Sequence, residues 1–235
     1  MFDMNKQIFK TSKMADVVLE NYYMILVLER LGMQLGFHDK TVEDICEENA
    51  ISSKVFLTIA NLYNYKIIEK DINFDNDEVK TILDYLKISH DFFSHDLLAK
   101  IEKNINQMIA INDKPEMLMV KQFFNNYKAE VLHHFAFENN TVFPYIINLL
   151  NDDRSIDVFS INEYNEHHDD IEETLYELKR LLIQHLPPHD DIEIRRKILH
   201  DLSDLENDLN IHTKIENEII IPLVKKLENI KTIEK

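Results

Sequence analysis

Two stretches of the chain repeat one spacing of histidine, glutamate, asparagine and proline. The residues, in the same order in both copies, are His134, Glu138, Asn139 and Pro144, and His212, Glu216, Asn217 and Pro222. Because residues four apart lie about one turn apart on one helix face, each copy would hold an imidazole beside a carboxylate. A single pair of this kind usually forms a solvated ion pair. Two matching copies on apolar helices indicate a metal site inside a helical bundle.

The composition favours an all-α fold. Of 235 residues, 45% are hydrophobic, which is enough for a sizeable core, and the two glycines are Gly32 and Gly36. A β-rich fold of this length would need further glycines in its hairpins and bulges. The single cysteine, Cys46, excludes an intramolecular disulfide and a metal site built from several thiolates.

The charge of the chain excludes several partners. The net charge is −17, and acidic residues are concentrated between positions 152 and 173. Such a surface repels nucleic acid and anionic lipid, so we expect neither nucleic acid nor membrane as a partner. The N-terminus lacks the apolar core of a signal peptide, and no stretch approaches the roughly 20 apolar residues of a membrane helix. We therefore expect a cytoplasmic protein.

A small helical N-terminal domain is predicted over residues 1–70. An apolar helix over 15–31 would end at Gly32, Thr41 is a suitable N-cap for a second, and Ser52 or Ser53 starts a third. A helix-turn-helix over 41–63 would be typical of DNA binding, but this stretch contains four closely spaced acidic residues and a single cation, Lys54, before residue 66. A small helical domain that packs on a partner or on itself fits better.

A polar stretch over residues 69–77 marks the predicted boundary to a second domain over 78–230. Its apolar pattern predicts four long helices over about 78–111, 115–150, 159–186 and 190–227. Thirty helical residues span about 45 Å, which suits an up-down-up-down bundle with short connections. Pro144 and Pro222 lie inside the second and fourth helices, where each should kink the helix and aim the preceding turn.

The first and third helices should also supply ligands, because a bundle core does not tolerate unpaired His and Glu. The first helix offers His90 and His95, and the third offers His167 and His168. His90 and His168 share the apolar stripe of their helices, so we prefer them over His95 and His167. His133 has Phe137 rather than Glu four residues on, which predicts an exposed position or one behind the ligands.

The predicted metal ligands are four histidines and two glutamates on four helices. They are His90, His134, Glu138, His168, His212 and Glu216. Imidazole and carboxylate without thiolate suit Fe, Mn or Zn rather than an iron–sulfur cluster. Two carboxylates from facing helices could each bridge two ions and leave coordination positions open for a small ligand. Iron is the interpretation that fits a diatomic gas or electron transfer.

These stretches resemble the hemerythrin-like (HHE cation-binding) proteins, and most closely the RIC family, the di-iron proteins for repair of iron centres. Residues 82–91, the two His-x3-Glu stretches and His168 carry the similarity, which covers almost the whole chain. The resemblance implies a hemerythrin-like four-helix bundle preceded by a small helical domain. It also implies a non-haem di-iron centre of two Fe ions, oxo- or hydroxo-bridged, with Glu138 and Glu216 as bridges.

The chain departs from related patterns at two places. Oxygen-carrying hemerythrins have an additional His ligand one turn after the third-helix His, whereas Ile171 and Glu172 stand here. This difference favours the repair family. RIC members often carry a Cys-Cys pair where this chain has Gly36-Phe37, so the resemblance does not extend to thiol chemistry or cluster delivery by that pair.

Three functions compete. The first is a di-iron protein of nitrosative and oxidative stress that binds or reduces nitric oxide, or supplies iron for iron–sulfur cluster repair. The second is a sensor of oxygen, redox state or nitric oxide that acts through protein partners. The third is a metal-free structural bundle. Expected partners are nitric oxide, O2 and iron–sulfur proteins, and the sequence leaves monomer and homodimer open.

Overall fold

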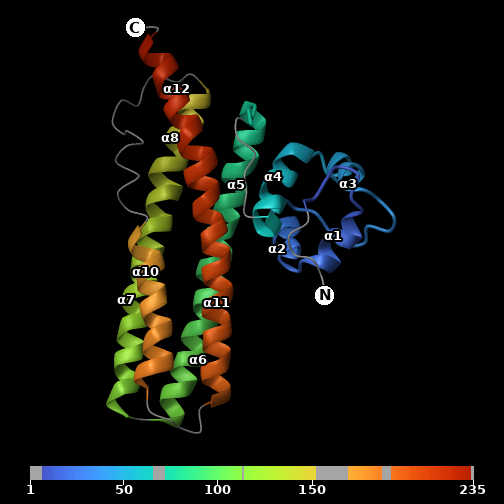
Figure 1. The fold of residues 1–235 in the computed structure, drawn as a ribbon. Helices are drawn as coiled ribbons and strands as arrows, with labels where there is room; N and C mark the ends of the chain where they lie inside the picture. The colour runs from blue at the N-terminus through green and yellow to red at the C-terminus, as the bar shows by residue number, and fades with distance from the viewer. Residues whose placement is uncertain (1–6, 66–71, 113, 152–168, 187–191, 234–235) are drawn as a thin grey trace. The chain divides into compact units, whose positions relative to one another are not determined.

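The computed structural model of the protein describes residues 7–65, 72–112, 114–151, 169–186 and 192–233 (Figure 1). Within these ranges the regular structure is helical, with an isolated antiparallel bridge between Lys13 and Thr41. The all-α prediction is confirmed. The chain divides into two compact units, Met1–Ser89 and His90–Lys235. Because this division falls inside helix α5 (Asn76–Phe92), the domain limits 1–70 and 78–230 stay a prediction.

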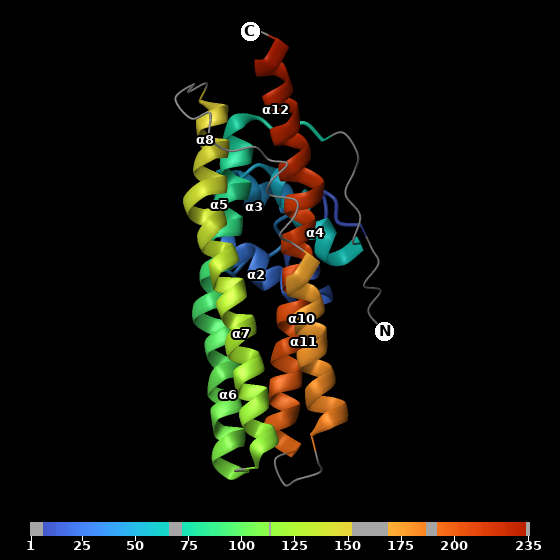
Figure 2. The ribbon, with the colours of Figure 1, turned by 90° about the vertical axis from the view of Figure 1, so that its left-hand side faces the viewer.

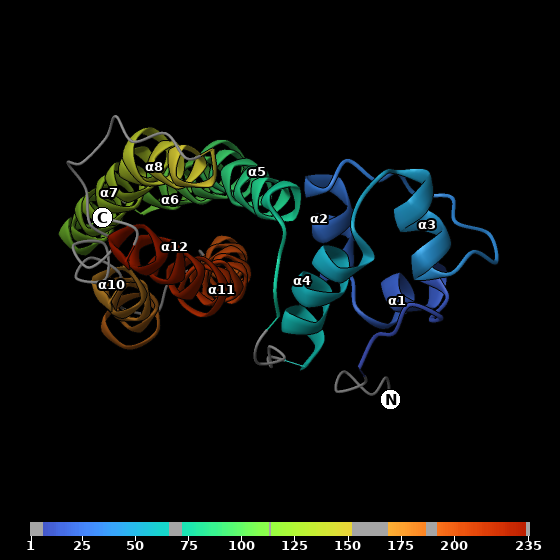
Figure 3. The same ribbon diagram turned by 90° about the horizontal axis from the view of Figure 1, so that it is seen from above.

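The first unit contains α1 (Met14–Glu20), α2 (Tyr23–Arg30), α3 (Val42–Glu48), α4 (Ser53–Tyr65) and the start of α5. Helices α2 and α3 both pack against α4, and α1 packs against α2 (Figure 3). The predicted N-terminal helices are present, but the single helix over residues 15–31 is wrong. The structure divides it between α1 and α2.

Asn21 causes that division. Its backbone is extended, with φ −144° and ψ 107°. Its side-chain oxygen accepts a hydrogen bond from the backbone N–H of Tyr23 at 3.0 Å, and its amide donates to Oδ1 of Asn64 at 2.6 Å. Asparagine side chains compete in this way with helical hydrogen bonds. The tertiary partner on α4 therefore overrides an apolar pattern that is continuous in the sequence.

The predicted end of α2 and start of α3 are confirmed. Gly32 has φ +72°, and the N–H of Met33 donates to the carbonyl of Leu28 at 2.8 Å, which is the hydrogen bond of a Schellman cap. At the start of α3, the hydroxyl of Thr41 accepts from the N–H of Asp44 at 3.2 Å. The Asp44 carboxylate accepts from the N–H of Thr41 at 2.8 Å, which completes a capping box.

Polar contacts tie the start of α5 to the other helices of the first unit. The Glu78 carboxylate accepts a hydrogen bond from the Ser52 hydroxyl at 2.6 Å. Deeper in, the buried guanidinium of Arg30 donates to the hydroxyls of Tyr63 at 3.1 Å and Tyr85 at 3.3 Å. The first part of α5 therefore belongs to this unit by its side chains as well as by its backbone.

The second unit is built on four helices that run side by side (Figures 1 and 2). They are α6 (Leu98–Ile111), α7 (Pro115–Phe137), α10 (Asp169–Arg180) and α11 (Ile192–Ile215). Helices α6 and α10 each pack against both α7 and α11, which closes a four-helix bundle. Helices α8 (Phe143–Leu150) and α12 (Ile221–Ile233) continue α7 and α11 and pack against each other.

The predicted helical ranges agree with the described residues. The fourth helix starts at Ile192 and continues to Ile233, past the predicted end near Leu227. The predicted start of the third helix, near Phe159, lies outside the described residues. Apolar side chains of all four helices fill the bundle, among them Ile105, Phe124, Leu178 and Leu205. Among the described residues, no helix is both long and apolar enough to cross a lipid bilayer.

The bundle helices and the helices that continue them, here called rods, contain π-helical turns, and those that begin at Phe93, Glu138 and Glu216 lie close to predicted ligands. These turns are η1 (Phe93–Leu97), η2 (Glu138–Val142), η3 (Leu181–His185) and η4 (Glu216–Ile220). In η2 and η4, the N–H of Phe143 donates to the carbonyl of Glu138, and that of Ile221 donates to Glu216. Such turns are frequent at functional sites.

Each motif proline follows such a turn, as the second residue of α8 or α12. Proline has no N–H, and its ring collides with the carbonyl four residues back, so a wider turn relieves the conflict. The structure thus places a π-helical turn where the sequence predicted a kink. The turn η1 contains no proline, so proline is not required for one.

Candidate metal centre

Four buried side chains of metal-ligand type converge inside the second unit. They are His90 at the end of α5, His212 in the last turn of α11, and Glu138 and Glu216 as the first residues of η2 and η4. Each offers a nitrogen or oxygen atom within 4.8 Å of the others. The helical face that the four-residue spacing defines therefore points inward in both copies of the motif.

The distances show that these atoms surround a common point. Nε2 of His90 lies 2.9 Å from Nε2 of His212 and 3.1 Å from Oε2 of Glu138. Nε2 of His212 lies 3.0 Å from Oε1 of Glu216, and Nε2 of His134 lies 3.2 Å from Oε1 of Glu138. Imidazole and carboxylate atoms directed at one another in this way suit a divalent cation of the Fe, Mn or Zn type.

Burial makes the charges of this cluster costly unless they are compensated. The side chains of His90 and Glu138 are 1% and 0% exposed, and an isolated buried charge costs several kcal/mol. Burial alone would raise the pKa of Glu138. Hydrogen bonds and positive charge from His134 and His90 outweigh burial, and they hold the pKa of this carboxyl well below its ordinary value. The cluster is therefore built to keep Glu138 ionised, which is the form that binds a cation.

Aromatic side chains enclose the histidines. The His90 ring stacks on Phe135, with centroids 4.2 Å apart and planes at 14°, and lies 5.7 Å from Phe143. The ring of Phe93 meets His212 edge-on at 5.7 Å. These phenylalanines are buried. They exclude water from the cluster and restrict the orientations of the two imidazoles.

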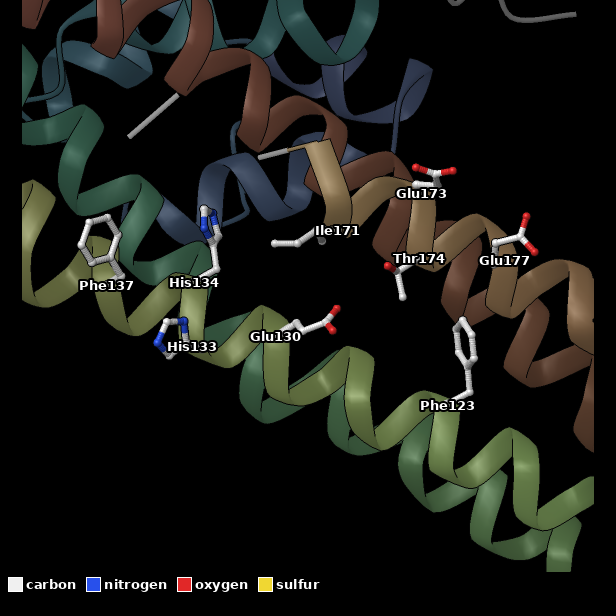
Figure 4. A pocket seen from close by; sticks show the side chains of 9 residues that line it. All are labelled: Phe123, Glu130, His133, His134, Phe137, Ile171, Glu173, Thr174 and Glu177. Carbon is white, nitrogen blue, oxygen red and sulfur yellow. The ribbon is translucent and has the colours of Figure 1, made fainter. Parts of the chain in front are cut away.

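His134 lies at the edge of the cluster that borders a pocket. Its side chain is 10% exposed, whereas that of His212 is 3% exposed. The pocket has a volume of about 790 Å3 and is lined by side chains of α7 and α10 (Figure 4). Besides His134, its lining includes Glu130 and His133 from α7 and Ile171 and Glu177 from α10. A small solute in this pocket would meet His134 before His90 or His212.

The remaining candidates fall in different places. His95 is exposed, as expected from its poorer fit to the apolar stripe, and His133 is exposed, which is one of the two positions predicted for it. His167 and His168 lie outside the described residues. The structure thus brings four of the six predicted ligands within 4.8 Å of one another and places a fifth, His134, beside Glu138, and their role as metal ligands stays a prediction.

Sequence reasoning missed the residues behind the ligands. The side-chain oxygen Oδ1 of Asn139 accepts a hydrogen bond from Nδ1 of His90, with 3.0 Å between the two atoms. Its repetition after Glu216 as Asn217 was a visible signal to which no role was assigned. The stacking of Phe135 and Phe143 on His90 could not have been predicted, because it joins two rods.

A second group of ligand-type residues lies on α11, formed by His200, Asp201 and Asp204. His200 is exposed and forms an ion pair with Asp204 at 3.0 Å. The Asp201 carboxylate accepts from Nζ of Lys100 at 2.7 Å and from Nδ2 of Asn104 at 3.1 Å. A lysine ammonium already occupies the position of a cation, so this group connects α11 to α6.

Residues 81–224 match the Hemerythrin HHE cation binding domain, and the chain therefore belongs to this family. The match contains all six predicted ligands. The predicted resemblance to hemerythrin-like proteins is confirmed, and with it a domain that binds metal cations.

The chain is also similar to the iron-sulfur cluster repair protein ScdA of Staphylococcus haemolyticus (strain JCSC1435). The two sequences are 24% identical over 135 residues, which cover 54% of this chain and 60% of that relative. This similarity agrees with the expected closeness to cluster repair proteins.

Proposed function

We propose that this protein holds a non-haem di-iron centre and acts in the response to nitrosative and oxidative stress. In this role it binds or reduces nitric oxide, supplies iron for the repair of iron–sulfur clusters, or does both. The observation that carries the proposal is the buried convergence of His90, Glu138, His212 and Glu216 within 4.8 Å. The name of the ScdA relative supports cluster repair as the setting.

The residues of the site would have different roles in holding the metal. His90 and His212 offer Nε2 from the interior, His134 offers Nε2 at the pocket edge, and Glu138 and Glu216 supply the negative charge. We assign the remaining ligand to His168. Bound iron would supply open coordination positions for a diatomic ligand and a source of electrons. Phe93 and Phe135 would keep bulk water from that ligand.

Thiol chemistry has no place in this proposal. Burial raises the pKa of the Cys46 thiol to about 11, so it is protonated near neutral pH and is a poor nucleophile and metal ligand. Phe37, which stands at the position of the Cys-Cys pair of the repair family, is buried in the core of the first unit. Any iron that leaves the protein would therefore leave imidazole and carboxylate ligands.

The test is the metal content of purified protein, measured by elemental analysis together with the optical spectrum of the oxidised form. We expect two iron ions per chain and a change of spectrum when the reduced protein meets nitric oxide. His212→Ala should lose iron, whereas His133→Ala, which changes the exposed neighbour of His134, should retain it. Protein that binds no iron after reconstitution, or that shows no spectral response to nitric oxide, would contradict the proposal.

A sensor is the second candidate, and helix α5 is the observation that favours it. This helix begins in the first unit, and its last turn carries His90. A change at the metal could therefore reach the N-terminal helices through a continuous rod and alter how they bind a protein partner. Hydrogen exchange of residues 15–63 in the oxidised and reduced states tests this. Different protection supports sensing, and identical protection argues against it.

A further inference from the structure

Two consecutive residues contact the two ring nitrogens of one predicted ligand, one nitrogen each. Oε2 of Glu138 lies 3.1 Å from Nε2 of His90, and Oδ1 of Asn139 lies 3.0 Å from Nδ1 of the same ring. Both residues open the π-helical turn η2, whereas His90 comes from another rod, 49 residues away from Asn139 in the chain.

The plane of the His90 ring is set by its aromatic neighbours. Phe135 and Phe143 both stack on it, with planes at 14° and 10° to the imidazole. Within this plane two orientations remain, related by a half-turn that exchanges each nitrogen with a carbon. Stacking does not distinguish between them. A polar neighbour at the ring edge is needed to select one.

The tautomer of the ring must also be selected. For Nε2 to offer its lone pair to a cation, the ring proton must reside on Nδ1. The side-chain carbonyl of an asparagine can only accept a hydrogen bond, so it favours a ring that carries this proton. Histidines that bind metals generally donate their second ring N–H to such an acceptor.

We propose that Asn139 is a positioning residue, whose side-chain carbonyl accepts the Nδ1 proton of His90 and so orients Nε2 to offer its lone pair to a cation held together with Glu138, His212 and Glu216. This inference rests on the proposed metal site. It adds that the asparagine after the glutamate serves the site through His90 rather than as a ligand itself.

Substitutions at two neighbouring positions separate this role from a general effect on the fold. Asn139→Leu keeps the approximate size of the side chain and removes the acceptor. Asn139→Asp restores an acceptor oxygen. Asn140→Leu is the matched control, because Asn140 is exposed, lies in the same turn and donates its amide to the carbonyl of Ala136 at 2.7 Å.

The measurement is the affinity of the full chain for Zn2+, a diamagnetic substitute for iron, by competition with a chelator. Removing the partner of a ligand histidine typically costs 10- to 100-fold in metal affinity, so we expect a loss of about this size for Asn139→Leu. Asn139→Asp and Asn140→Leu should bind as the wild type does. Wild-type affinity in Asn139→Leu, or an equal loss in Asn139→Asp, would overturn the proposal.

Nuclear magnetic resonance of the Zn2+-loaded protein supplies a readout that a purely structural role would not change. The wild type, Asn139→Asp and Asn140→Leu should show a slowly exchanging Nδ1–H proton of His90, and Asn139→Leu should lose it. If this proton persists in Asn139→Leu, the proposal is wrong. Failure of the wild type to bind Zn2+ or iron would contradict the proposed metal site itself. Equal binding by all variants would contradict only the role of Asn139.

Discussion

The two copies of the His-x3-Glu motif share their spacing but differ in their surroundings. His212 is buried, contacts His90 and Glu216, and lies against Phe93. His134 borders a pocket between α7 and α10 and contacts Glu138. The histidine of the second copy thus lies in the interior of the cluster and that of the first at its edge, while the glutamates of both copies are buried. Equal spacing along a helix does not imply an equal environment, because the neighbouring rods decide what each imidazole meets.

The asparagines differ in the opposite direction, whereas both carboxylates are buried. Glu138 lies between two imidazoles, those of His90 and His134. Asn139 is half-buried and contacts His90, whereas Asn217, its counterpart in the second copy, is exposed. Since both copies have the same residues in the same order, the difference arises from packing.

The largest effect should come from removing one histidine of each copy. We expect His212→Ala to lower the affinity for iron or Zn2+ by at least about 100-fold, and His134→Ala by about tenfold, since water can reach the edge position and replace the imidazole. Titration against a chelator measures both. Equal losses in the two variants would remove the distinction between interior and edge.

The next effect concerns the stability of the metal-free protein. Glu138→Gln keeps the shape of the side chain and removes its charge, which leaves His90 and His134 facing a poorer acceptor. We expect a loss of about 1–3 kcal/mol near neutral pH, measured by urea unfolding.

The pH dependence of that loss has a definite sign. Because the folded-state pKa of Glu138 is lowered, its contribution to stability is fully present above its ordinary pKa of 4.5 and disappears as the pH falls through the lower folded value. The difference between wild type and Glu138→Gln should therefore shrink below pH 4.5. A difference that grows on acidification would contradict the assignment.

Replacing the proline of each motif copy should have the same effect in both copies. In Pro144→Ala and Pro222→Ala a backbone N–H returns, so the preceding turn can revert to α-helical hydrogen bonding and shift the glutamate. We expect helix content to be unchanged, the unfolding free energy of the metal-free protein to fall by less than about 1 kcal/mol, and metal affinity to weaken in both variants. Circular dichroism and chelator competition provide the measurements. A response in only one copy would show that the two turns have different roles.

The smallest effect should come from His133, which precedes the edge histidine and is exposed. His133→Ala should change the unfolding free energy by no more than about 0.5 kcal/mol and leave metal content unchanged. Thermal unfolding and elemental analysis measure stability and metal content, and the comparison of His133→Ala with His134→Ala shows whether the site ends at His134. Loss of metal in His133→Ala would show that His133 also belongs to the site.

Much of the fold was predictable because it depends on local patterns. The Schellman cap at Gly32, the capping box at Thr41 and the long apolar rods follow from residues within a turn or two of one another. The break at Asn21 was not predictable, because it depends on Asn64, which is 43 residues away. The start of the predicted third rod and His168 lie outside the described residues.

For the candidate site, the sequence alone determined which side chains share a helix face, because helical periodicity relates residues three and four apart. His134 with Glu138 and His212 with Glu216 are pairs of this kind. The tertiary structure decided what those faces meet. His90 reaches Asn139 across 49 residues and His212 across 122, and such contacts exist only once separate rods pack together. The repeat thus specified the chemistry of the site, and the packing of the bundle decided which of the two motif histidines lies inside and which borders the pocket.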